Sequence, residues 1–185
     1  MAESDRIRWD QRFAQGGDIG LPPPAWLEEV DHELPHHGRA LDVAAGAGRV
    51  ALWLARRGLD VVAVDISEVG LGLARQMAET RGLCIEMVSA DLEIMPLPDG
   101  PFDVITCFRY RQRDLFPAIR ERLGPAGIFI AEVATVANLE RHQHPSRRYL
   151  AEPGELEQDC APLEIRYYQE GWFDDEALAR VVARK

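Results

Sequence analysis

The segment Ala40–Arg49 (ALDVAAGAGR) constrains the fold of this chain more than any other part of the sequence. It has the pattern of a short apolar strand, a tight turn of small residues and the start of a helix. Gly46 and Gly48 can adopt positive φ, and they leave room for a ligand to approach the backbone. The helix behind them offers free N–H groups and a positive dipole end to an anion. The segment therefore predicts a strand-turn-helix unit that binds a ligand at its turn.

Residues 39–135 continue this pattern, because short apolar runs alternate with helix-like stretches as in the βα units of a parallel sheet. We expect strands over Ala40–Ala44, Asp60–Val64, Cys84–Ser89, Phe102–Phe108 and Gly127–Glu132. We expect helices over Arg49–Arg57, from an N-cap at Ser67 to Thr80, and from an N-cap at Asp114 to Leu123. The fold class is α/β, with a doubly wound and mostly parallel sheet.

The flanking regions have other patterns, within what we expect to be a single domain over 1–185. Residues 1–38 place Trp9 and Phe13 at helical spacing and predict a further helix from about Ala25. Residues 136–162 are polar and interrupted by prolines, so we expect a long loop beside the ligand-binding edge of the sheet. Residues 163–185 predict a C-terminal hairpin that turns around Gly171.

Composition narrows the range of partners. The 185 residues are 46% hydrophobic, which suffices for a core without disulfides or a structural metal. A net charge of −10 disfavours nucleic acid and favours a small-molecule partner. No apolar stretch approaches the roughly 20 residues of a membrane-spanning helix, and no secretory signal is evident, so we expect a cytoplasmic monomer or homodimer that does not bind membranes. The three widely spaced cysteines indicate neither a disulfide framework nor a metal site.

The glycine-rich turn and Asp65 together favour a nucleoside-containing cofactor, and two further acidic residues indicate which cofactor it is. Asp65 ends the second expected strand about twenty residues beyond the glycines, where a carboxylate can accept two ribose hydroxyls. Asp91 could accept a hydrogen bond from an adenine amino group. Asp42 lies inside the first strand, where NAD-binding strands are apolar, and an acid there suits a cofactor that carries an amino acid. An NAD(P)-binding oxidoreductase remains an alternative, because Gly46–Ala51 matches G-x-G-x-x-A.

Taken together, these motifs resemble those of class I S-adenosylmethionine (SAM) dependent methyltransferases. The matching segments are Leu41–Gly48, Asp65, Ala90–Leu92, Phe102–Cys107 and Leu123–Gly127. Ala44 stands where most of that superfamily has glycine, and in this respect the turn is similar to the small tellurite-resistance methyltransferases. The resemblance implies a seven-stranded Rossmann-like sheet of order 3-2-1-4-5-7-6 whose last strand is antiparallel.

The resemblance also implies roles for individual residues. SAM would be the cofactor, with Asp65 at its ribose and Cys107 and Phe108 beneath the methyl group to be transferred. The methionine part would be surrounded by Asp42, Ala44, Gly46 and Gly48, and the adenine by Ile66, Asp91 and Leu92.

The methyl acceptor is not identified by these motifs. A base would be needed for an oxygen or amine nucleophile, and the candidates are Glu132, His142 and His144. An anionic acceptor could be bound by Arg109, Arg111, Arg113, Arg147 and Arg148, unless these side chains form a solvated surface. We take Arg109, Glu132 and Arg147 as the catalytic hypothesis. A SAM-binding protein without catalytic activity is the remaining alternative.

Overall fold

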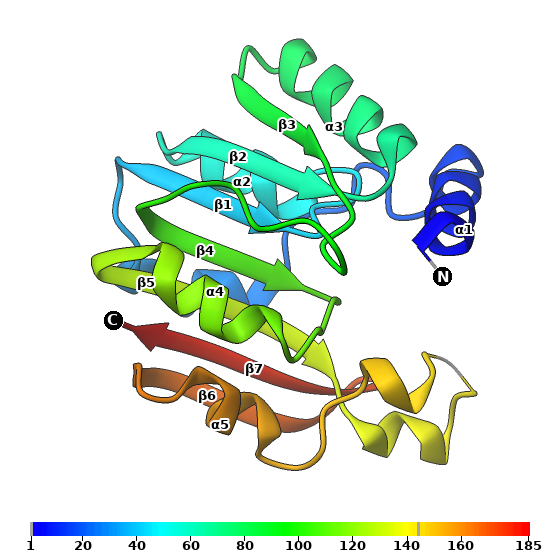
Figure 1. Cartoon of the computed structure of the whole chain (residues 1–185), viewed down its shortest axis with the longest axis vertical. Helices are drawn as coiled ribbons and strands as arrows, with labels where there is room; N and C mark the ends of the chain where they lie inside the picture. The colour runs from blue at the N-terminus through cyan, green and yellow to red at the C-terminus, as the bar shows by residue number, and fades with distance from the viewer. Residues whose placement is uncertain (1, 144) are drawn as a thin grey trace.

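A computed structural model describes residues 2–143 and 145–185 and contains a seven-stranded sheet of order β3-β2-β1-β4-β5-β7-β6 (Figure 1). β7 runs antiparallel to β5 and β6, whereas the other neighbouring strands are parallel. The expected strand order and antiparallel last strand are therefore confirmed. The strands are β1 (Arg39–Val43), β2 (Asp60–Asp65), β3 (Ile85–Ser89), β4 (Phe102–Phe108), β5 (Leu123–Ala134), β6 (Glu164–Phe173) and β7 (Glu176–Arg184).

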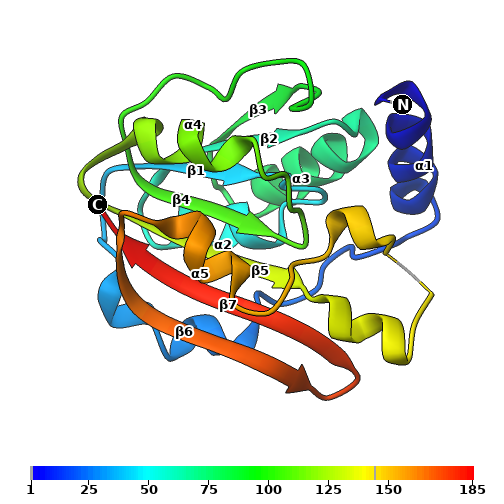
Figure 2. The same ribbon diagram turned by 60° about the horizontal axis from the view of Figure 1, so that its bottom comes forward.

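Helices cover both faces of the sheet (Figures 1 and 2). The α-helices are α1 (Ala2–Ala14), α2 (Arg49–Arg56), α3 (Glu68–Thr80), α4 (Leu115–Arg122) and α5 (Glu155–Cys160). The 3-10 helices are η1 (Ala25–Glu28), η2 (Asp31–Glu33), η3 (Val136–Glu140) and η4 (Arg147–Tyr149). α4 and α5 cover one face, whereas α2, α3, η1 and the residues Val30 and Leu34 that flank η2 contribute to the core on the other.

The strands divide their apolar side chains between the two faces, as their period of two requires. Leu41 and Val43 of β1 join the core beneath α4 and α5, whereas Ala40 joins the core beneath α2. β2 and β4 alternate in the same way. Because both faces are covered, the strands are nearly continuous apolar runs, which is the pattern from which they were predicted.

The expected loop over 136–162 is wrong in part, because the segment contains η3, η4 and α5. Thr135 forms a parallel bridge with Ala151, and Leu150, Ala151 and Leu156 are fully buried. These apolar residues are too few and too close together to produce a helical period over the usual window. The segment is therefore tied to the core at its centre.

Three smaller expectations also need correction. The β6–β7 hairpin turns at residues 174–175, and Gly171 lies within β6 opposite Leu178. The helix expected from Ala25 consists of two 3-10 turns, η1 and η2. The side chain of Asp114 makes no capping hydrogen bond, whereas Ser67 caps α3 as expected, since its Oγ accepts from the Gly70 N–H at 3.0 Å.

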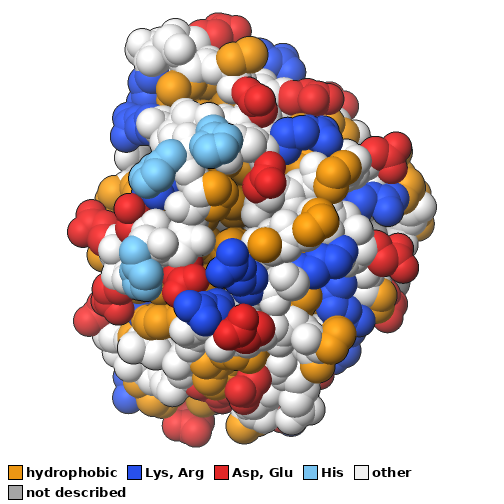
Figure 3. Space-filling model, turned by 90° about the vertical axis from the view of Figure 1, so that its left-hand side faces the viewer, with side chains coloured by type: hydrophobic (Ala, Val, Ile, Leu, Met, Phe, Trp, Pro, Cys, Tyr) orange, Lys and Arg blue, Asp and Glu red, His pale blue; other side chains and the backbone are white. Residues whose placement is uncertain are grey.

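The face at the amino ends of the parallel strands is shown in Figure 3, where acidic and basic side chains are interspersed with histidines. This face presents no extended field of one sign. Among the described residues, no helix has the length and apolar character needed to cross a membrane.

Candidate functional site

The glycine-rich turn and Asp65 meet at the carboxyl ends of β1 and β2. Val43 pairs with Val64 across these strands, so the turn after β1 faces the last residue of β2. Gly46 N–H donates to Asp65 Oδ2 at 2.8 Å, and Ser67 N–H donates to Asp65 Oδ1 at 2.8 Å. Burial raises the pKa of Asp65, although these backbone hydrogen bonds oppose the shift. A single buried carboxylate thus holds together two of the motifs found in the sequence.

The turn itself uses left-handed backbone at three positions. Ala44, Gly46 and Gly48 have φ of 56°, 54° and 79°. A Cβ on Gly48 would lie 2.6 Å from the Cβ of Ala74 in α3, so glycine is required there by close packing. Ala44 has no such freedom, and the left-handed conformation costs an L-residue roughly 1–2 kcal/mol.

Asp42 lies buried beneath the turn. It is 2% exposed, and Thr106 Oγ1 donates to its Oδ1 at 2.7 Å. Burial raises the pKa of Asp42 to about 7, although the hydrogen bond from Thr106 opposes the shift. Burial also raises the pKa of the neighbouring Cys107 thiol, which excludes Cys107 as a ready thiolate nucleophile.

Asp91 offers a free hydrogen-bond acceptor at the end of β3. Its Oδ1 accepts from the Glu93 N–H at 2.9 Å, but its buried Oδ2 has no partner in the part of the chain that the structure describes. Leu92 is buried beside it, and the Leu92 carbonyl accepts from Gln112 Nε2 at 3.1 Å. An unpartnered buried acceptor is uncommon in a folded protein and fits a ligand that donates an N–H.

Helix α1 lies beyond the carboxyl ends of β1, β2 and β3 (Figures 1 and 2). Asp10 fastens it to α3, because Asp10 Oδ1 accepts from Ser67 Oγ at 2.6 Å and from the Val69 N–H at 3.3 Å. Phe13 packs on the turn so closely that a Cβ on Gly46 would lie 2.9 Å from its ring. Sequence reasoning missed Asp10, because no local pattern marks its partners 57 and 59 residues away.

Glu132 is the centre of a buried cluster at the carboxyl ends of β4 and β5, beside β7. It is 2% exposed and accepts from Trp26 Nε1 at 2.8 Å, Arg109 Nε at 3.1 Å and Arg180 Nε at 2.9 Å. Arg109, whose φ is 60°, also donates to both carboxylate oxygens of Glu176 at 2.6 and 2.7 Å. Sequence reasoning identified Arg109 and Glu132 but missed Trp26 and Arg180.

The other arginines considered for an anionic acceptor are already paired with carboxylates. Arg111 is not part of a solvated surface, since its side chain is 0% exposed and Nη2 contacts Glu155 at 2.8 Å and Asp159 at 2.6 Å. Burial raises the pKa of Glu155, but hydrogen bonds from Arg113 and Arg111 dominate and lower it to about 2. Arg113, Arg147 and Arg148 pair with Glu155, Glu152 and Glu93 at 2.7, 2.6 and 2.5 Å.

Of the two histidines considered as a base, the structure describes only His142. His142 Nε2 lies 2.7 Å from the backbone oxygen of Asp175, and Glu132 is not among its hydrogen-bond partners. His144 lies outside the described residues. Within the described ranges, no group of three or more histidine, cysteine or acidic side chains is placed to hold a metal ion.

Comparison with known proteins shows what the central part of the chain is similar to. Residues 40–127 match the family model described as a methyltransferase domain. A demethylmenaquinone methyltransferase of Thermus thermophilus is 44% identical over 70 residues, which cover 37% of this chain and 32% of that protein. The chain spans less than half the length of the first curated relatives that it matches.

Solved structures extend the similarity of fold to almost the whole chain. TehB from Haemophilus influenzae superimposes with a TM-score of 0.75 at 18% identity, over 96% of this chain and 67% of TehB. The [4+2]-cyclase SpnF superimposes with a TM-score of 0.75 at 17% identity, over 100% of this chain and 96% of SpnF.

Residues 40–127 are therefore similar to a methyltransferase domain, and the sheet has the strand order that we expected for a class I SAM-dependent methyltransferase fold. The fold is also similar to that of TehB, as the turn containing Ala44 led us to expect. The family match favours this interpretation over the NAD(P)-binding alternative. The assignments of individual site residues stay predictions.

Proposed function

We propose that this protein is a SAM-dependent methyltransferase that acts on a small-molecule acceptor. The observation that carries the proposal is the hydrogen bond of 2.8 Å between the Gly46 N–H and Asp65, which joins the glycine-rich turn of β1 to the acid at the end of β2. In an open α/β sheet, ligands bind at this edge of the strands. The cytoplasmic location expected from the sequence stays a prediction.

The residues of this edge fit SAM. The unpartnered Oδ2 of Asp91 can accept a hydrogen bond from the adenine amino group, and Leu92 and Ile66 would supply apolar surface around the adenine. Each oxygen of Asp65 keeps a lone pair beyond its backbone hydrogen bond and can accept from a ribose hydroxyl. Asp42, Ala44, Gly46 and Gly48 would surround the methionine part, and Cys107 and Phe108 would lie beneath the reacting group. When bound, SAM supplies a methyl group on a sulfonium, ready for in-line transfer.

The protein's own contribution would be alignment and exclusion of water. Arg109 would orient an acceptor at the end of β4, and Arg147 would approach from η4. Glu132 has both oxygens occupied by three N–H donors, so we assign it a positioning role toward Arg109 rather than the role of a base. An acceptor that reaches Arg109 must compete with Glu176 or carry no charge there.

A second candidate function is SAM binding without methyl transfer. This candidate is favoured because the arginines considered for binding an anionic acceptor are already paired with carboxylates. These are Arg109, Arg111, Arg113 and Arg147. A screen of small-molecule acceptors that detects S-adenosylhomocysteine separates the two candidates. Turnover that Arg147→Ala reduces, without a change in SAM affinity, would support the methyltransferase; binding without turnover across the screen would favour the second candidate.

Calorimetric titration with SAM, S-adenosylhomocysteine and NADH tests the cofactor assignment. We expect the first two to bind and NADH not to bind. Asp65→Ala should weaken SAM binding by about 2–4 kcal/mol, because it removes both ribose hydrogen bonds. Binding of NADH alone would replace our proposal with the oxidoreductase alternative.

Asp103→Ala is the matched control for Asp65→Ala. Asp103 Oδ2 also accepts a hydrogen bond from a backbone N–H, that of Arg39 at 2.8 Å. This bond lies at the amino ends of β1 and β4, away from Asp65. We expect Asp103→Ala to leave SAM affinity unchanged. Equal affinity losses in the two variants would mean that Asp65 acts only through the stability of the sheet.

A further inference from the structure

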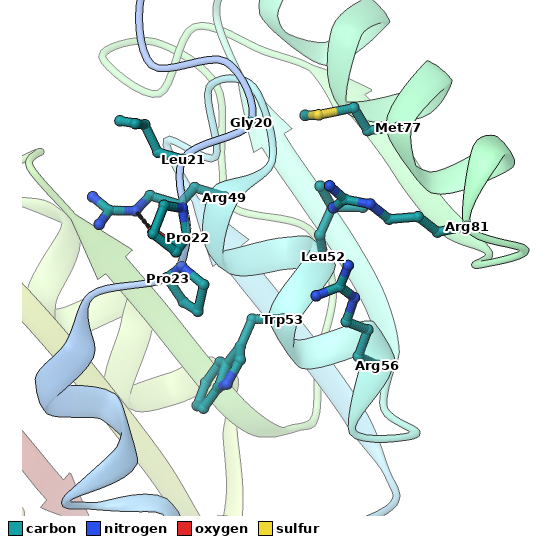
Figure 4. Close-up of a pocket in the computed structure, with 10 residues that line it drawn as sticks. All are labelled: Gly20, Leu21, Pro22, Pro23, Arg49, Leu52, Trp53, Arg56, Met77 and Arg81. Carbon is teal, nitrogen blue, oxygen red and sulfur yellow. Dashed lines mark hydrogen bonds between the residues drawn. The ribbon is translucent and has the colours of Figure 1, made fainter.

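We propose a second ligand site, in which a small organic anion with an apolar body binds on the outer surface of α2 and α3. The site is a hollow of about 250 Å³ between these helices and the segment 20–23 (Figure 4). Apart from Arg49, its lining residues lie outside the motifs proposed to bind SAM, and the site goes beyond the proposed function.

The charge of the hollow is the first argument. Arg49, Arg56 and Arg81 line it, and none of its ten lining residues is acidic. The side chains of Arg56 and Arg81 make neither a hydrogen bond nor an ion pair with any residue that the structure describes. Most other arginines of the chain pair with carboxylates, as Arg57 does with Asp31. In a chain of net charge −10, this is a local excess of positive charge without an internal counterion.

The orientation of the side chains is the second argument. Figure 4 shows Arg56 from the end of α2 and Arg81 from the residue after α3 pointing their guanidinium groups into the space between the two helices. Arg49 points the other way, and its Nε donates to the Pro22 carbonyl. Two like charges that face one space repel each other, and an anion between them converts the repulsion into attraction. Guanidinium groups favour carboxylate and phosphate groups, which they can bind through paired N–H donors.

The apolar lining is the third argument and distinguishes this hollow from a general cation surface. Leu52, Trp53 and Met77 form its helical side, and Pro22 and Pro23 border it on the side of the segment 20–23. Its volume is below the range of about 300–1,000 Å³ that drug-sized ligands fill. The chemistry therefore selects a small oxyanion, a carboxylate or phosphate, attached to a short apolar chain or ring.

The hollow near η4 provides a contrast within the same molecule. It measures about 200 Å³ and is lined by Arg111, Arg113 and Arg148, but also by Glu93 and Asp114. Its arginines are paired with carboxylates, so an anion would gain little there. Of these two hollows, only the one between α2 and α3 has no acidic residue among the described residues that line it.

Octanoate, its neutral analogue octanamide and inorganic phosphate are suitable probes. The titration is followed by the indole N–H resonance of Trp53, which a Trp53→Phe variant assigns. We expect octanoate to shift this resonance saturably at about millimolar concentration or below. Octanamide and inorganic phosphate should bind at least about 10-fold more weakly, because each lacks one of the two features that the hollow recognises.

Arg56→Gln and Arg81→Gln should each weaken octanoate binding by about 10-fold or more. Arg75→Gln is the matched control, because Arg75 is an exposed arginine of α3 that does not line the hollow. Arg81→Lys keeps the charge and should retain most of the binding, and circular dichroism checks the fold of each variant.

Three results would overturn the proposal: a shift that does not saturate, equal binding of octanamide, or an equal loss in Arg75→Gln. SAM titration of the same variants is an independent measurement. Octanoate binding therefore tests this hollow even if the protein fails to bind SAM.

Discussion

At the carboxyl ends of the parallel strands, the two halves of the sheet differ in what holds their buried carboxyl groups. In the half formed by β1, β2 and β3, Asp42, Asp65 and Asp91 are held by a hydroxyl or by backbone N–H groups, and Asp91 keeps a free oxygen. In the half formed by β4, β5 and β7, Glu132 is held by two arginines and Trp26. The first half can accept hydrogen bonds from a ligand as it stands. The second half must give up an internal ion pair before a charged ligand can bind.

The largest expected effect tests the ion-paired half. Glu132→Ala leaves Arg109, Arg180 and the Trp26 N–H without their shared acceptor, so the free energy of unfolding should fall by about 4 kcal/mol. Glu176→Ala removes the other carboxylate partner of Arg109. Because Glu176 is half exposed, the free energy of unfolding should fall by less than about 1 kcal/mol. Urea unfolding of both variants measures the difference. Similar losses would contradict the central role of Glu132.

The next prediction concerns how stability depends on pH through Asp42, in the half formed by β1, β2 and β3. Folded protein holds a proton on Asp42 up to about pH 7, whereas the unfolded chain releases it near pH 4. The contribution of Asp42 to stability is therefore full at low pH and is lost as the pH rises from about 4 to 7. Asp42→Asn should gain stability relative to the wild type by about 4 kcal/mol between pH 4 and pH 8. A difference between the two proteins that does not change with pH would refute the buried, protonated Asp42.

A smaller effect concerns the free oxygen of Asp91. Asp91→Asn can keep the hydrogen bond from the Glu93 N–H but places an N–H₂ group where the adenine amino group needs an acceptor. SAM affinity should fall by about 1.5 kcal/mol, while the free energy of unfolding should not fall. Calorimetry and urea unfolding of one variant give both numbers. A loss of stability without a loss of affinity would make Asp91 a purely structural residue.

The smallest effect compares two alanines with left-handed backbone, Ala44 directly after β1 and Ala126 near the start of β5. Ala44 and Ala126 both stand at positive φ, 56° and 60°. Replacement by glycine relieves left-handed strain of roughly 1–2 kcal/mol but adds about 0.4–1 kcal/mol of chain entropy on unfolding. Ala126→Gly and Ala44→Gly should therefore each raise the free energy of unfolding by about 0.5 kcal/mol. A loss of stability in Ala44→Gly alone would show that its methyl group contributes packing that the turn needs.

The same contrast explains what the sequence could predict. The strands, the helices of the core and the turn of β1 depend on residues that are close together in the chain, and these were predicted with small errors at their ends. Glu132 meets Trp26, Arg109 and Arg180 across 106, 23 and 48 residues, and no local pattern encodes such a pairing. α5 was missed because six residues are too few to establish a helical period.

The position of β7 between β5 and β6 has a consequence for aggregation. Residues 128–133 of β5 are all buried, as are Ala177–Ala179 and Val181–Ala183 of β7. If the β6–β7 hairpin separates from β5, two long apolar strands expose unpaired backbone, which favours pairing between molecules. In the folded sheet the edge is instead β6, where Glu164, Arg166 and Glu170 are exposed. The strand order that brings Arg180 to Glu132 thus also keeps the apolar segments of β5 and β7 from pairing with other copies of the chain.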